Sequence, residues 1–119
     1  NSTLWSSWAI ISEVGRIYFS GDTGYGKHFK KIGDDYGPFD LALLDCGQYN
    51  DAWKYSHMVP EEGVQASLDL KASQFMPIHW GAFTLSTHDW ADPVKRAFTF
   101  SEKKRLNMIY PEIGEIVVL

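Results

Sequence analysis

Three short apolar segments end abruptly in polar or small residues, and this pattern organises the chain. Each segment has the length and apolar content of a buried strand. The three segments are 16–20, followed by Gly21-Asp22; 40–44, followed by Asp45-Cys46-Gly47; and 74–78, followed by His79-Trp80-Gly81. Because ligands bind outside the carboxyl ends of the strands in open α/β sheets, the pattern predicts a site along one edge of a sheet.

Segments with the apolar spacing of an amphipathic helix lie between and after these strands. The three predicted helices are residues 27–36, 60–70 and 92–106. In the first helix, Phe29, Ile32 and Tyr36 recur at intervals of three and four residues, which is the spacing of one helix face. Pro60 suits the first position of the second helix, and the two acids that follow it suit the positive end of the helix dipole.

The apolar segments together predict a mixed sheet. The predicted strands are 4–11, 16–20, 39–46, 74–78, 108–110 and 115–118. The first two flank a turn and are expected to pair as an antiparallel hairpin. The third is almost continuously apolar, which is typical of a strand covered on both faces. Strands that alternate with helices predict one α/β domain over residues 1–119, with helices flanking a mixed β-sheet.

Composition narrows the class of protein. The chain has 119 residues, 45% of them hydrophobic, which favours a single packed domain. The formal net charge of −4 argues against a nucleic-acid partner. The single cysteine excludes an internal disulfide and fits a reducing cytoplasm, which is the location we expect. Apolar runs fall short of the roughly 18–20 residues that span a bilayer, so contact with a membrane would be peripheral.

Asp22 and His79 are the candidate metal ligands. A carboxylate beside flexible glycines at a strand end can approach a metal ion, and imidazole is a common ligand of zinc and related ions. Asp22 can instead cap the next helix or close an Asx-turn. His79 can instead be a core histidine bonded to a backbone carbonyl. The two residues support each other's assignment because both belong to the same predicted sheet edge.

His57 and the aromatic loop before it are candidates for substrate binding. His57 immediately precedes a predicted helix, where it can act as a general acid or bind an anionic group. It can also be a surface residue that flanks the helix. Tyr49, Trp53 and Tyr55 can form the wall of a substrate pocket or pack against the sheet edge.

The other reactive side chains have simpler interpretations. We expect His28 to be solvated, His88 to lie in a loop or helix cap, and Cys46 to belong to the core. The chain has no His-x-His cluster, no glycine-rich phosphate loop and no Gly-x-Ser-x-Gly elbow. A catalytic zinc site takes at least three protein ligands. The candidates here are too few for a closed site, so further ligands are expected from elsewhere.

Five stretches, in the same order along the chain, resemble the C-terminal half of a metallo-β-lactamase-fold hydrolase. The resemblance is to the branch that includes the N-acyl-phosphatidylethanolamine-hydrolysing phospholipase D and its bacterial relatives. The stretches are Leu4-Trp5-Ser6-Ser7-Trp8, Phe19-Ser20-Gly21-Asp22-Thr23-Gly24-Tyr25, Gly37-Pro38-Phe39-Asp40-Leu41-Ala42, His57-Met58-Val59-Pro60-Glu61-Glu62 and Ile78-His79-Trp80-Gly81-Ala82-Phe83.

The resemblance implies an αββα sandwich with two divalent metal ions, usually zinc, at one sheet edge. Asp22 matches the metal-bridging aspartate, which has a catalytic role, and His79 matches the last metal-ligand histidine. His57 matches a catalytic histidine near the substrate phosphate. The implied reaction is attack by a metal-bound hydroxide on a phosphodiester or phosphorylated ester of a small-molecule or lipid-like substrate.

The family's upstream His-x-His-x-Asp-His motif and its next histidine ligand are absent from these residues. We therefore expect Asn1 to be an internal start, and the chain to be the C-terminal part of a longer protein and inactive alone. Half a sandwich leaves one sheet face bare, which the N-terminal half of the fold or self-association would cover. Two alternatives stay open: a lactonase acting on a sugar-acid phosphate, and a non-catalytic binding module that lost the metal site.

Overall fold

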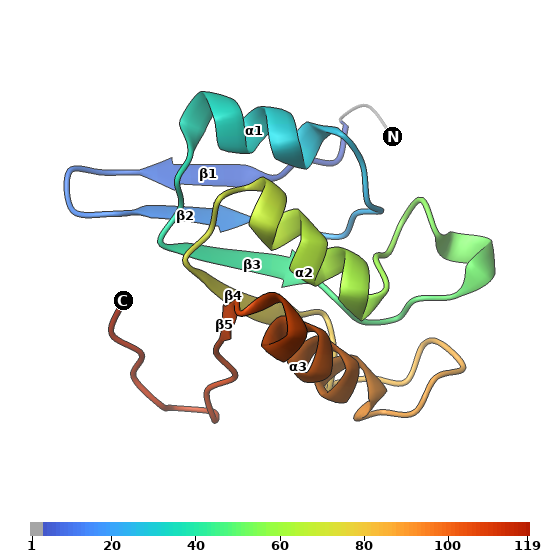
Figure 1. Cartoon of the computed structure of the whole chain (residues 1–119). Coiled ribbons are helices and arrows are strands. Elements are labelled where there is room, and N and C mark those ends of the chain that lie inside the picture. The colour runs from blue at the N-terminus through green and yellow to red at the C-terminus, as the bar shows by residue number, and fades with distance from the viewer. Residues whose placement is uncertain (1–3) are drawn as a thin grey trace.

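Five strands form one mixed sheet in the computed structural model, which describes residues 4–119 (Figure 1). The predicted internal start at Asn1 lies outside these residues. In sheet order the strands are β1 (Trp8–Ile11), β2 (Arg16–Phe19), β3 (Leu41–Asp45), β4 (Gln74–Ile78) and β5 (Asn107–Met108). The first two strands are antiparallel, which confirms the predicted hairpin. All other neighbouring strands are parallel, so their carboxyl ends share one edge.

Three α-helices connect the parallel strands and lie along one face of the sheet (Figure 1). They are α1 (His28–Tyr36), α2 (Pro60–Asp69) and α3 (Asp92–Lys104), and a short 3-10 helix η1 (Asp51–Trp53) lies in the loop after β3. The proline predicted to open α2 does so, and the Glu62 side chain accepts a hydrogen bond from the Val59 backbone N–H at 3.1 Å. No helix between residues 4 and 119 combines the length and the apolar character that crossing a membrane requires.

The core lies between the sheet and the helices. Alternate residues of β2, β3 and β4 face the helices. One buried cluster contains residues of these three strands and of all three helices. Its members include Tyr18, Phe29, Ala42, Leu44, Val64, Phe75 and Ala97. The packing is close at the end of β3, because a Cβ on Gly63 of α2 would lie 2.4 Å from the Cys46 sulfur. This packing fixes the position of the sheet edge where the polar residues follow the strands.

The opposite face of the sheet is apolar and partly exposed. The exposed fractions of Trp8, Ile10 and Phe19 are 64%, 58% and 40%. The strand register places Trp8 opposite Phe19, and Ile10 opposite Ile17, on the same side. We call this surface the open sheet face and define it by Trp8, Ile10, Ile17, Phe19, Leu43 and Met76. A bare apolar face was expected from the sequence and is present.

Of the two strands predicted at the end of the chain, one is absent and the other is shorter and shifted by one residue. Residues 115–118 do not form a strand, and the segment predicted at 108–110 is instead the two-residue strand β5. Ile116 and Val118 are each 88% exposed. Apolar alternation becomes a strand only when a neighbouring strand pairs with it, and the described part of the chain offers residues 115–118 no such pairing. The first strand is also shorter than predicted and begins at Trp8.

Candidate functional site

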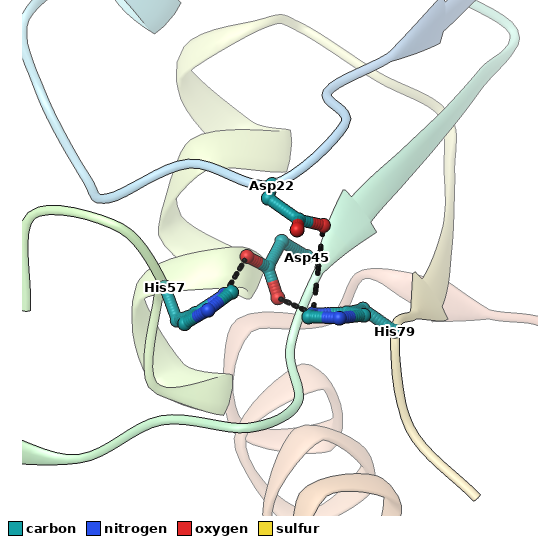
Figure 2. Close-up of side chains that lie close together, drawn as sticks. All are labelled: Asp22, Asp45, His57 and His79. Carbon is teal, nitrogen blue, oxygen red and sulfur yellow. Dashed lines mark hydrogen bonds and ion pairs between the residues drawn. The ribbon is translucent and has the colours of Figure 1, made fainter. Parts of the chain in front are cut away.

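Side chains from the carboxyl ends of three parallel strands meet at one edge of the sheet (Figure 2). Asp22 follows β2, Asp45 ends β3 and His79 follows β4, while His57 reaches the same place from the loop before α2. Each of the four offers a ligand-type atom, and these atoms all lie within 4.8 Å of one another. We call these four residues the strand-end cluster.

The structure brings together Asp22 and His79, the two metal ligands predicted from the sequence. The distance from Asp22 Oδ1 to His79 Nδ1 is 3.6 Å, which is too long for a hydrogen bond. The Asp22 side chain is 55% exposed and the His79 side chain 28% exposed. The pair therefore presents a carboxylate oxygen and an imidazole nitrogen toward each other in a place that a solute can reach.

Asp45 occupies the centre of the cluster and was not predicted as a site residue. Its side chain is fully buried. Oδ2 lies 2.9 Å from His57 Nδ1, and Oδ1 lies 3.3 Å from His79 Nδ1. Backbone N–H groups of Thr23 and Gly47 donate to the two oxygens at 3.2 and 3.3 Å. Burial raises the pKa of the Asp45 carboxyl, and the hydrogen bond with His57 opposes that rise.

Local backbone geometry directs His79 out of its strand. Its φ of 65° lies in the left-handed region, which costs a non-glycine residue about 1–2 kcal/mol. The loop after β3 packs directly on this turn, because a Cβ on Gly47 would lie 1.8 Å from the His79 carbonyl oxygen. Only glycine fits that contact, so Gly47 and His79 fix each other's backbone.

His57 lies beside the predicted ligand and beside one of the predicted pocket aromatics. The ring centroids of His57 and His79 are 4.9 Å apart, and the Trp53 ring meets His57 edge-on at 6.3 Å. The Trp53 carbonyl also accepts a hydrogen bond from the His57 backbone N–H at 3.0 Å. Trp53 is 42% exposed, so it forms a partly open aromatic wall next to the cluster.

Tyr49, also predicted to bind substrate, makes its contacts elsewhere. Its hydroxyl donates a short hydrogen bond to Asp92 at the start of α3. Its ring stacks on His88 with centroids 4.2 Å apart, and the Arg96 guanidinium lies 5.0 Å from the ring centroid. Burial and the Asp92 carboxylate raise the pKa of Tyr49. These contacts anchor the loop after β3 to α3, and the predicted role in substrate binding stays a prediction.

Cys46, His28 and His88 lie where the sequence predicted them. Cys46 is buried, and burial raises the pKa of its thiol well above the ordinary value, which disfavours the reactive thiolate. His28 is exposed, and His88 lies in the loop before α3 with its Nδ1 2.9 Å from the Asp89 carbonyl oxygen.

The donor set of the cluster fits a divalent cation. A carboxylate oxygen and a neutral imidazole nitrogen are ligands that zinc, manganese and iron accept. The side chains of Asp22, His79 and His57 are 55%, 28% and 15% exposed, whereas Asp45 is enclosed. The two predicted ligands, Asp22 and His79, are fewer than the three that a catalytic zinc site uses.

The comparisons with known proteins agree with this geometry. The family model for the beta-lactamase superfamily domain matches residues 1–80. Uncharacterized protein Rv0906 of Mycobacterium tuberculosis is 48% identical over 120 residues, an alignment that covers 98% of this chain and 32% of that protein. The N-acyl-phosphatidylethanolamine-hydrolyzing phospholipase D 1 of Caenorhabditis elegans is 38% identical over 124 residues, covering 98% of this chain and 35% of that protein. The chain thus spans about a third of the length of these relatives.

A solved structure shares the fold. The metallo-beta-lactamase fold protein YhfI from Bacillus subtilis superimposes with a TM-score of 0.63 at 15% identity, covering 86% of this chain and 39% of that one. At this identity the likeness concerns the fold alone. The mixed sheet, the one-sided helices and the matched family model lead to one conclusion: the chain belongs to the beta-lactamase superfamily and carries part of a metallo-β-lactamase fold.

Proposed function

We propose that this chain is part of a metal-dependent hydrolase, in which Asp22 and His79 are ligands of a site that binds two zinc ions. The observation that carries the proposal is the approach of Asp22 Oδ1 to His79 Nδ1, at 3.6 Å, on the carboxyl edge of the sheet. When bound, such ions activate water and stabilise the charge that develops on a scissile ester. In this proposal, Asp22 and His79 would bind the metal, and neighbouring residues of this chain would orient the substrate beside it.

The proposed substrate is a phosphodiester or another phosphorylated ester with a lipid-like or small organic group. One relative, 38% identical, is named for hydrolysing N-acyl-phosphatidylethanolamine. His57 stands three positions before Pro60, the first residue of α2, where the helix dipole favours an anion. We assign His57 to the substrate phosphate and Trp53, which meets its ring edge-on, to the substrate's organic group.

The open sheet face supports a second part of the proposal. The family fold is a sandwich, and this chain spans about a third of its relatives. We propose that an upstream half of the same fold packs on the open sheet face and supplies the remaining metal ligands. Covering Trp8, Ile10 and Phe19 would remove their large apolar surfaces from water.

Metal content tests the proposal most directly. Elemental mass spectrometry would be run on this chain and on a version extended upstream, alongside hydrolysis of a phosphodiester by the extended protein. About two metals on the extended protein, little metal on the short chain, and hydrolysis only by the former would support the proposal. Absence of metal from both would overturn it.

A further inference from the structure

Asp45 is the least accessible residue of the strand-end cluster and the only one that contacts both histidines. Its two oxygens are used separately, Oδ2 for His57 and Oδ1 for His79. Figure 2 shows the two imidazoles on different sides of the carboxylate, each with one nitrogen turned toward it. The contacts therefore join a loop residue and a strand-end residue through one buried group.

The remaining contacts of Asp45 indicate that its role differs from that of the proposed metal ligands. A carboxylate has about four lone-pair positions. Here the Thr23 backbone N–H shares Oδ2 with His57, and the Gly47 backbone N–H shares Oδ1 with His79. All four positions face nitrogen atoms of the protein. A metal ion at Asp45 would have to displace one of these groups inside a fully buried site, whereas Asp22 needs no such displacement.

We propose that Asp45 is a positioning residue that holds His57 and His79 with their Nδ1–H groups donated to its carboxylate, which leaves Nε2 as the unprotonated nitrogen of each ring. An acceptor-only carboxylate selects the Nδ1–H form of any ring that faces it, since the nitrogen opposite an acceptor must carry the proton. A metal-ligating histidine commonly donates its second ring nitrogen to a carboxylate in this way. For His79, the orientation toward a metal rests on the proposed function.

The same arrangement predicts that asparagine cannot take over the role of Asp45. Asparagine offers one carbonyl oxygen and one NH₂ group. The oxygen can accept from only one of the two rings, so the other ring would face the NH₂ donor and would have to accept at Nδ1, with its proton moved to Nε2. An Asp45→Asn variant should therefore keep the shape of the site while reversing the tautomer of one imidazole.

Tautomer measurement tests the proposal without any mutation. The full-length protein would be labelled with ¹⁵N-histidine, and long-range ¹H–¹⁵N spectra recorded above the ordinary histidine pKa of about 6.5. His57→Gln and His79→Gln variants assign the signals. We expect a protonated Nδ1 and an unprotonated Nε2 in both rings. A protonated Nε2 in either neutral ring would overturn the proposal.

A matched pair of variants adds a functional readout. Asp45→Asn is expected to lower metal affinity by about 10–100-fold, the range for loss of a group that orients a metal ligand. Asp40→Asn makes the same change just before the opposite end of β3, where Oδ2 accepts from the Arg16 backbone N–H at 2.7 Å, and should alter affinity less than about twofold. Equal metal affinity in the two variants, together with wild-type tautomers of both rings in Asp45→Asn, would contradict the proposal.

Failure of the proposed function would look different. A wild-type protein that binds no metal and hydrolyses no phosphodiester would refute the hydrolase. Its tautomer spectra would still decide the role of Asp45. If Asp45→Asn does not fold, the wild-type spectra alone give the answer.

Discussion

Asp22 and His79 approach within 3.6 Å of each other although they follow β2 and β4, two strands that β3 separates in the sheet. Asp45, the last residue of β3, lies between them and contacts His79. Three strand ends in a row therefore contribute one side chain each to a single point, and the parallel pairing of β2, β3 and β4 brings them together.

Replacing either predicted ligand should remove metal and activity but leave the fold. For Asp22→Ala we expect a change in unfolding free energy within about 1 kcal/mol, because the side chain is 55% exposed. For His79→Ala we expect a loss of about 1–2 kcal/mol, since Asp45 loses one partner. Metal content, phosphodiester turnover and urea unfolding of the full-length variants check this. Full turnover in either variant would contradict the assigned role.

His57→Ala should lower turnover of the full-length protein while metal content stays at the wild-type level. The reason is that His57 contacts the buried Asp45 and is assigned to the substrate, not to the metal. Elemental analysis and steady-state kinetics measure the two effects. His28→Ala, which removes an exposed imidazole, is the control and should change neither quantity. Loss of metal in His57→Ala would make His57 a ligand and its present assignment wrong.

The chain expressed alone should self-associate through the open sheet face. Analytical ultracentrifugation of the wild type is expected to show concentration-dependent association, because Trp8, Ile10 and Phe19 leave a large apolar surface in water. Ile10→Lys should reduce it. Val14→Lys, at a position 98% exposed in the hairpin turn, makes the same type of change outside the face and should not. A wild-type chain that stays monomeric would refute this prediction.

The hydrogen bond between Tyr49 and Asp92 should make stability depend on pH. This bond, aided by Arg96, holds the pKa of Asp92 below its ordinary value, and burial opposes the shift. A carboxyl with a lowered pKa stabilises the fold above its unfolded pKa of about 3.9, and the contribution disappears as pH falls through the lowered value. Asp92 is 36% exposed, so we expect no more than about 1 kcal/mol.

Tyr49→Phe tests that contribution. Urea unfolding should show the variant less stable than the wild type at about pH 7, with the difference shrinking by about pH 3. Tyr36→Phe removes a hydroxyl from a tyrosine that is 51% exposed and serves as the control. A difference between Tyr49→Phe and the wild type that grows toward acid pH would have the wrong sign for this account.

Most of the fold and part of the site could be predicted from the sequence. Apolar periodicity located β2, β3, β4 and the three helices because each packs on the same core. It failed at residues 115–118, where alternation is present but no neighbouring strand is paired with it among the described residues. Asp45 was missed although it follows the same apolar pattern as Asp22. Its importance lies in contacts with His57 and His79, and long-range contacts of this kind leave no local signal.

The contact between Gly47 and His79 has a consequence for how mutational scans of this protein would be interpreted. Any added Cβ at Gly47 would lie 1.8 Å from the His79 carbonyl oxygen, so even alanine must move the backbone that carries the imidazole. An alanine scan would then score Gly47 among the catalytic positions, although it has no side chain to offer a substrate or a metal. For the proposed site, the missing Cβ of Gly47 would then matter as much as the imidazole of His79.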